Sequence, residues 1–136
     1  MKYLLDTKAL IAFFNNEDGA DKVAAILEEI DEDKAEGFIS AITVTELYYL
    51  YSRRIGERLA RERIEQLRIS NLRIVPINED IAIKAGEYKV KAIPIADALI
   101  AASAHLIDAH VVTDDEHFEK VNVRVLRFRG QGSKKE

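Results

Sequence analysis

The chain has 136 residues, of which 48% are hydrophobic, so it is long enough for one domain with a substantial core and too short for two. It contains no cysteine, which excludes disulfides, thiolate metal sites and cysteine catalysis and is compatible with a reducing cytoplasm. The net charge of −4 argues against nonspecific binding to nucleic acid, so an RNA-binding role would need a local basic patch. No apolar run approaches the ~18 residues of a membrane span, and the N-terminal run is too short for a signal peptide, so we expect no membrane partner.

The first predicted strand, residues 3–6, is apolar until it ends in Asp6, and a helical pattern follows over residues 7–14. A strand without alternation of polar and apolar residues is typical of a parallel sheet that helices cover on both faces. Ligands bind such sheets at the edge where the strands end and the helices begin. Asp6 is therefore expected at a binding edge.

The rest of the chain alternates between helical and extended patterns. Strands are expected at 3–6, 37–42, 72–77, 110–113 and 121–128, with helices in the segments between them. Asn78 is expected to cap one of these helices, and Pro94 to start another. This alternation predicts right-handed crossovers and a three-layer α/β/α domain. We expect the domain to span residues 1–129, followed by a flexible C-terminal tail at 130–136 that is rich in Gly, Ser and Lys.

Acidic residues stand at or near four predicted helix starts, and each has an ordinary interpretation as a helix-capping group. Thr43 with Glu46, and Thr113 with Glu116, match the capping-box pattern. The capping interpretation is weaker for Asp97, because apolar residues flank it in a largely buried helix. An unpaired carboxylate in such a place costs several kcal/mol.

The four helix starts would all lie on one edge of the sheet, so their acids could meet. Two carboxylates ~4 Å apart repel by about 4 kcal/mol at an effective dielectric near 20. A group of three or four is stable only if it shares a proton or binds a divalent cation. Ligands that are all oxygen favour Mg²⁺ or Mn²⁺, at which a bound water is activated for hydrolysis.

Four motifs occur in series along the chain: Leu5-Asp6-Thr7-x-Ala9-Leu10-Ile11, Thr45-Glu46-Leu47, Ala96-Asp97-Ala98-Leu99-Ile100-Ala101-Ala102 and Thr113-Asp114-Asp115-x-x-Phe118. Their order and spacing resemble the signature of the PIN domain, and more narrowly that of the VapC-type toxins of toxin–antitoxin pairs. The resemblance covers nearly the whole chain. It implies a Mg²⁺-dependent ribonuclease whose central parallel sheet has about five strands in the order 3-2-1-4-5. It also implies a homodimer that a small antitoxin from the neighbouring gene neutralises.

The resemblance also assigns roles to individual residues. Its metal-site acids correspond to Asp6, Glu46, Asp97 and Asp115. Asp114 occupies a variable position of the last motif and is a further candidate ligand. Thr7 and Thr113 would support these acids, Thr113 by orienting its neighbours through hydrogen bonds. Lys8 departs from the family pattern, which more often has a small hydroxyl residue there, and it could contact a phosphate or pair with a site acid.

Three further features leave alternatives open. Arg53 and Arg54 belong to the densest basic stretch and could bind RNA phosphates, although interleaved glutamates favour a solvated, ion-paired face. Three tyrosines in four residues, Tyr48, Tyr49 and Tyr51, raise the alternative of a non-catalytic interaction module with the same fold. The three histidines lack metal-ligand spacing, and only His117 lies beside the acidic turn.

Overall fold

The computed structural model describes residues 1–129. In chain order its elements are β1 (Lys2–Leu5), α1 (Thr7–Phe14), α2 (Ala20–Asp31), β2 (Glu36–Ser40), α3 (Ala41–Ile55), α4 (Glu57–Arg68), β3 (Arg73–Val75), α5 (Glu79–Lys89), α6 (Ile95–Ile107), β4 (His110–Thr113), the 3₁₀ helix η1 (Glu116–Lys120) and β5 (Val125–Arg127). The tail predicted at 130–136 lies outside the described residues. Among the helices that are described, none is both long and apolar enough to cross a membrane.

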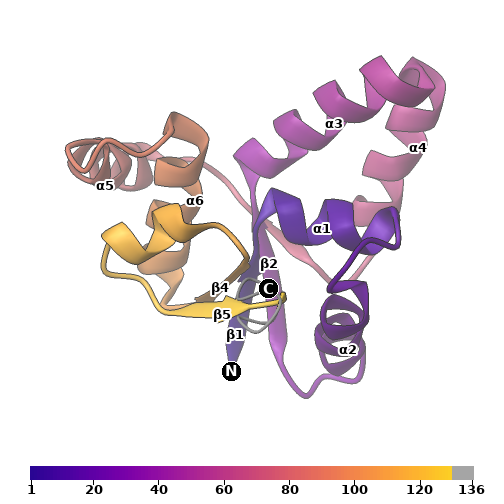
Figure 1. Cartoon of the computed structure of the whole chain (residues 1–136), viewed down its shortest axis with the longest axis horizontal. Helices are drawn as coiled ribbons and strands as arrows, with labels where there is room; N and C mark the ends of the chain where they lie inside the picture. The colour runs from indigo at the N-terminus through magenta and orange to yellow at the C-terminus, as the bar shows by residue number, and fades with distance from the viewer. Residues whose placement is uncertain (130–136) are drawn as a thin grey trace.

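The five strands form one parallel sheet in the order β3-β2-β1-β4-β5, which confirms the predicted order (Figure 1). β1 lies at its centre, where Leu4 is in register with Phe38 of β2 and Val111 of β4. Leu4 and Leu5 point to opposite faces of the sheet, and both are fully buried. Because β1 has no solvent-facing side, its sequence shows no alternation.

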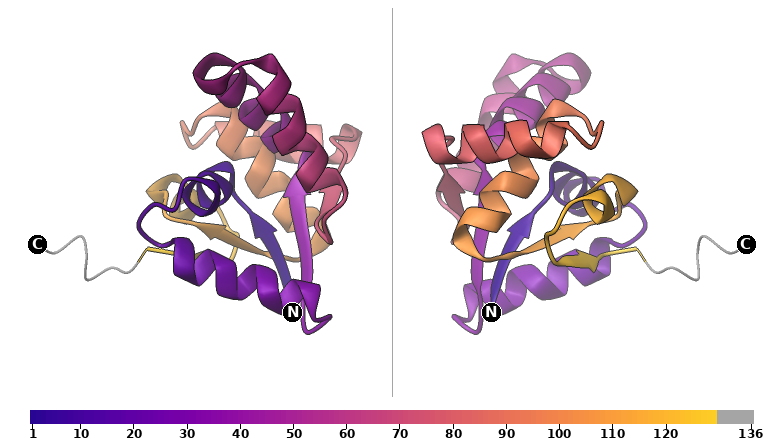
Figure 2. Two further views of the ribbon diagram at one scale, coloured as in Figure 1. Left: turned by 90° about the vertical axis from the view of Figure 1, so that its right-hand side faces the viewer. Right: turned by 90° about the vertical axis from the view of Figure 1, so that its left-hand side faces the viewer.

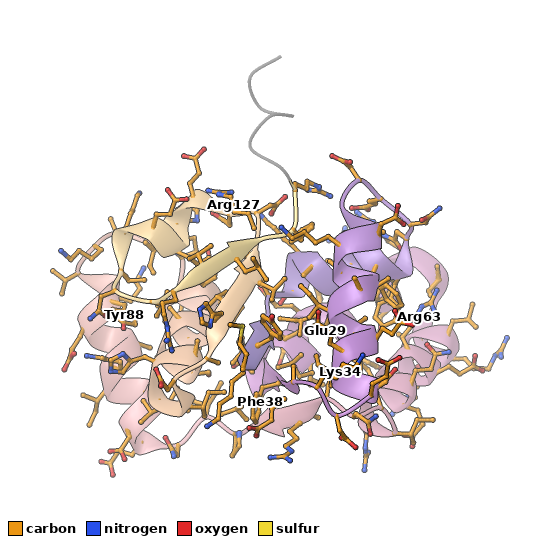
Figure 3. The ribbon with its side chains drawn as sticks, turned by 90° about the horizontal axis from the view of Figure 1, so that it is seen from below. Glu29, Lys34, Phe38, Arg63, Tyr88 and Arg127 are labelled. Carbon is orange, nitrogen blue, oxygen red and sulfur yellow. The ribbon has the colours of Figure 1, made fainter. Side chains whose placement is uncertain are left out.

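Helices cover both faces of the sheet, as Figure 2 shows, and this confirms the three-layer α/β/α architecture. Leu5 packs in the core cluster that α1, α2, α3 and α4 share, and Leu4 packs in the cluster with α5 and α6. Figure 3 shows the same arrangement from below, with Tyr88 on the side of α5 and Arg63 on the side of α4. The two clusters therefore fix the position of β1 between them.

α3 and α4 form a helical hairpin that extends away from the sheet (Figure 1). The chain reverses at Gly56, whose φ of +94° and ψ of 158° lie in a region that residues with a side chain avoid. One face of the hairpin is tied to the core through Leu47 and Tyr51 of α3 and Leu67 of α4. The first turns of α3 are thereby held beside the end of β1.

Two predicted capping boxes are wrong. α3 begins at Ala41 because the hydroxyl of Ser40 accepts a hydrogen bond from the Ile42 N–H at 3.4 Å, so Thr43 lies inside the helix. After β4, Asp115 caps η1 by accepting from the His117 N–H at 2.9 Å. The capping residue is thus three positions earlier than predicted at α3 and two positions later than predicted at η1. Glu46 therefore does not close a capping box at the start of α3.

Other local predictions have mixed outcomes. Asn78 caps α5 as predicted, since its side chain accepts from the Ile81 N–H at 2.9 Å. The last strand is shorter than the predicted 121–128, because only Val125–Arg127 pairs with β4. β5 is an edge strand that pairs only with β4, and short edge strands are common in proteins.

Candidate active site

The carboxyl ends of β1, β2 and β4 meet at one edge of the sheet, and acidic side chains from four remote segments gather there. Asp6 follows β1, Glu46 lies on α3, Asp97 in the first turn of α6, and Asp115 between β4 and η1. A cavity of about 300 Å³ opens among the first three of these acids. Its wall is completed by Thr7, Lys8, Ile11, Tyr49 and Leu50.

Asp6 is the most deeply buried of these acids, with an exposed fraction of 2%. It occupies the N-cap position of α1 but makes no side-chain capping hydrogen bond. Its carboxylate instead accepts a hydrogen bond from the Thr113 hydroxyl at 2.7 Å. Burial raises the pKa of Asp6 to about 7, and repulsion from Asp97 and Glu46 adds to this effect, while the Thr113 hydrogen bond opposes it.

Glu46 is held by the residue that follows Asp6. The Thr7 hydroxyl lies 2.5 Å from the Glu46 carboxylate and 3.0 Å from the hydroxyl of Thr43. Thr43 is fully buried one turn before Glu46 on α3. The pair of threonines therefore fixes α3 against the start of α1 and sets the direction of the Glu46 side chain.

Asp97 and Asp115 approach each other across an imidazole. The Nδ1 atom of His117 lies 2.9 Å from Oδ2 of Asp97 and 3.0 Å from Oδ1 of Asp115. One donor atom from each of the three residues lies within 4.8 Å of the other two. Partial burial raises the pKa of Asp97 despite its hydrogen bond with His117, and the neighbouring Asp115 raises it further.

Lys8 is bonded to the second oxygen of Asp115, with 3.0 Å between Nζ and Oδ2. Partial burial acts to raise the pKa of Asp115, but the His117 N–H and the Lys8 ammonium outweigh it and hold this pKa below its usual value. Of the two roles foreseen for Lys8, the structure shows the pairing with a site acid. The ammonium side chain is still 57% exposed, so it lies at the mouth of the site.

The remaining predicted residues lie at the margins of the site. Asp114 is directed away, because its carboxylate is paired with the Arg129 guanidinium. Arg53 stacks over the Tyr49 ring at 5.4 Å and donates to its hydroxyl at 3.0 Å. Since Tyr49 lines the cavity, Arg53 lies beside its rim, while Arg54 is exposed further along α3.

The sequence marked His117 only as a residue beside the acidic turn that could touch substrate, and not as a partner of Asp97 and Asp115. His117 is separated from Asp97 by 20 residues, and no regular ligand spacing relates the two. The available signal was its position two residues after Asp115, in a turn that carries three consecutive acids. The 3₁₀ geometry of η1 turns the ring back toward α6, which the sequence pattern does not indicate.

The donor set fits a divalent cation. The cluster of Asp97, Asp115 and His117 offers three ligand atoms at one place, and burial, with repulsion between the acids, raises the pKa of Asp6 and of Asp97. Carboxylate and imidazole groups are the ligands of hydrolytic metal centres. Fold and site together define a parallel α/β domain with a potential metal centre at the carboxyl edge of its sheet.

Comparison with known families identifies this class further. The PIN domain family matches residues 3–123, which is most of the chain. The chain belongs to the PIN domain family. Comparison with curated proteins gives no match.

Several solved structures with a similar fold are proteins of toxin–antitoxin systems. The chain is similar to VapBC2 from Rickettsia felis, solved bound to a promoter DNA fragment, with a TM-score of 0.77, 22% identity and coverage of 93% of this chain and 98% of that one. FitAcB from Neisseria gonorrhoeae has a TM-score of 0.75 and 27% identity, with coverage of 93% of this chain and 97% of that one. VapC20 from Mycobacterium tuberculosis, a Sarcin-Ricin loop cleaving toxin, has a TM-score of 0.69 and 21% identity, with coverage of 89% of this chain and 95% of that one.

Proposed function

We propose that this protein is a metal-dependent ribonuclease, the toxin of a VapBC-type pair, which hydrolyses RNA phosphodiester bonds. The observation that carries the proposal is that Asp6, Glu46 and Asp97, from three remote segments, line one cavity, with Asp115 from a fourth segment close to Asp97. Helix capping does not account for Asp6, Glu46 and Asp97, because none of them makes a side-chain capping hydrogen bond to its helix. The similarity to VapC20, which cleaves the Sarcin-Ricin loop, supports RNA as the substrate class.

The proposed ligands of Mg²⁺ or Mn²⁺ are Asp6, Glu46, Asp97 and Asp115. When bound, such an ion supplies Lewis-acid chemistry, activating water toward phosphorus and stabilising the charge that develops on phosphate oxygens. Asp114 could join the ligands only by breaking its ion pair with Arg129. We therefore propose that it anchors the end of β5 instead.

The chain's own hydroxyls and cations position this machinery. Thr113 donates to Asp6 and accepts from the Asp115 N–H at 3.0 Å, so it links two of the proposed ligands. The Thr7 hydroxyl contacts the Glu46 carboxylate and the Thr43 hydroxyl, so it links the start of α1 to α3. Lys8 balances Asp115 and is exposed enough to meet a phosphate, and Arg53 and Arg54 provide positive charge further along α3.

We also propose a homodimer and a small antitoxin as partners, in a cytoplasmic setting. This rests on the similarity to chains solved in VapBC and FitAcB complexes. The alternative, a non-catalytic interaction module, loses support from the tyrosines. Tyr51 is buried and reaches Asn15, and Tyr48 contacts Glu57 on α4, which leaves Tyr49 as the strongly exposed ring of the three.

Cleavage of single-stranded RNA with and without Mg²⁺ tests the proposal. We expect Asp6→Asn and Asp97→Asn to abolish Mg²⁺-dependent cleavage while circular dichroism shows an intact fold. Asp80→Asn, an exposed carboxylate on α5, is the matched control and should cleave like the parent. Equal cleavage by the parent and the two site variants would contradict the proposal.

A further inference from the structure

The His117 ring is held in place from three directions. Its backbone N–H donates to Asp115 at 2.9 Å, its Nδ1 faces Asp97 and Asp115, and the next residue, Phe118, is fully buried in the core. A surface histidine with free rotation would lose several favourable rotamers on binding an ion. This ring has already lost them, so it is preorganised toward the two carboxylates.

The spacing of the donor atoms matches that of ligands around one cation. Two ligands at right angles on an ion with bonds of about 2.1 Å lie about 3 Å apart. Nδ1 of His117 is 2.9 Å from Oδ2 of Asp97 and 3.0 Å from Oδ1 of Asp115. Nδ1 is thus within hydrogen-bond distance of both oxygens, and a cation bound by these three atoms would require little movement of the side chains.

We propose that His117 is a nitrogen ligand of the metal centre, and that it makes the site select a first-row transition cation over Mg²⁺. Imidazole suits ions such as Co²⁺, Ni²⁺ and Zn²⁺, whereas Mg²⁺ prefers oxygen. Lys8 acts in the same direction, because its ammonium already neutralises Oδ2 of Asp115. A site with less negative charge binds every cation less tightly. The loss is greater for Mg²⁺, which is held mainly by electrostatic attraction, than for a transition cation that also binds the imidazole nitrogen.

The competing explanation is that His117 only donates a hydrogen bond to the two acids. In that case Nδ1 keeps its proton in the metal-loaded protein, and no electron spin on the metal reaches the ring. The inference rests on the proposed metal site but not on RNA as the substrate, so it can be tested without RNA.

The deciding experiment is pulsed electron paramagnetic resonance of the whole protein loaded with Mn²⁺. We expect modulation from a directly bound ¹⁴N nucleus, and a changed pattern after labelling with ¹⁵N-histidine. His117→Asn should lose the signal, and His105→Asn, an exposed histidine on α6, should keep it. Absence of nitrogen coupling in the parent protein, or its persistence in folded His117→Asn, overturns the inference, and the parent measurement decides even where the variant does not fold.

Titration calorimetry then measures selectivity. We expect Co²⁺ to bind at least about tenfold more tightly than Mg²⁺, and this ratio to fall by about tenfold in His117→Asn, chiefly through weaker Co²⁺ binding. An unchanged ratio contradicts the inference. Mg²⁺-dependent cleavage without nitrogen coupling would overturn this inference alone, whereas nitrogen coupling without cleavage of RNA would overturn the ribonuclease alone.

Discussion

The acidic site has an inner and an outer half that differ in how their negative charge is compensated. In the inner half, which comprises Asp6 and Glu46, the carboxylates meet the neutral hydroxyls of Thr113 and Thr7. These hydrogen bonds orient the carboxylates but supply no positive charge. Because Asp6 is also buried, its pKa rises to about 7.

In the outer half, Asp97 and Asp115 meet the basic side chains of His117 and Lys8. The pKa of Asp115 is accordingly held below its usual value, despite partial burial. The outer half thus has an ammonium group, that of Lys8, bonded to one of its acids, whereas the inner half is bonded to neutral hydroxyls. We infer that the need for an added cation arises chiefly at Asp6, while the outer half sets which cation is accepted.

The largest expected effect comes from neutralising the inner half. Asp6→Asn should lower RNA cleavage by at least about 100-fold, because a charged ligand becomes neutral. The free energy of unfolding of the metal-free variant at about pH 8 should be equal to or higher than that of the parent, since the amide still accepts from Thr113 and repulsion disappears. Single-turnover cleavage and urea denaturation measure the two effects. A large loss of stability would show that the Asp6 charge is compensated by the fold.

The next effect is a pH dependence that should come chiefly from Asp6, the most deeply buried acid of the inner half. The folded pKa of Asp6 lies near 7, above the ordinary value of 3.8, so the folded protein holds a proton that the unfolded chain has released. The stabilising contribution is therefore complete below about pH 4 and is lost as the pH rises through 7, with a slope of at most about 1.4 kcal/mol per pH unit. Urea denaturation of metal-free protein across this range should show the decline.

Asp6→Asn serves as the control for this decline, because it removes the titrating group and should flatten the curve. Asp115 has the opposite sign. Its lowered pKa gives stability that is present at neutral pH and is lost only as the pH falls below about 4. A decline between about pH 4 and pH 7 that survives in Asp6→Asn would assign the effect to another group.

A smaller effect should follow from cutting the link between the halves. Thr113 is fully buried, donating to Asp6 and accepting from the Asp115 N–H. Thr113→Val keeps the shape but leaves both groups without this partner, so we expect a loss of about 1–3 kcal/mol in the free energy of unfolding. The exposed Thr45→Val on α3 is the matched control, with an expected change of at most about 0.5 kcal/mol. Equal stability of the two variants would contradict the proposed link.

The fold was largely predictable because its strongest signals are local. The unbroken apolar run of β1 indicates burial on both faces, and Asp97 among apolar residues indicates a polar group with a special environment. Strand order came from resemblance to a family, since no single segment encodes which strands are neighbours. The ends of helices were less predictable: Ser40 and Thr43 are both good caps, and only the length of β2 decides between them.

The two halves of the site differ in predictability for a related reason. Thr7 follows Asp6 directly, and Thr113 starts the last acidic motif, so their partnership with acids can be anticipated from motifs. The pairs that Lys8 and His117 make with Asp115 and Asp97 join residues up to 107 positions apart. Their geometry depends on how η1 packs against α6, a tertiary contact that leaves no periodic pattern in the sequence.

The smallest expected change in stability concerns Lys8 at the mouth of the outer half. Its side chain is 57% exposed, and surface ion pairs of this kind contribute at most about 1 kcal/mol. Lys8→Ser should therefore alter the free energy of unfolding by less than about 0.5 kcal/mol. The same change should tighten Mg²⁺ binding by about threefold to tenfold, because it frees Oδ2 of Asp115 and removes a positive charge. Lys2→Ser, remote from the site on β1, is the control for calorimetry. If Lys8→Ser weakens Mg²⁺ binding instead, the ammonium organises Asp115 for the ion and does not compete with it.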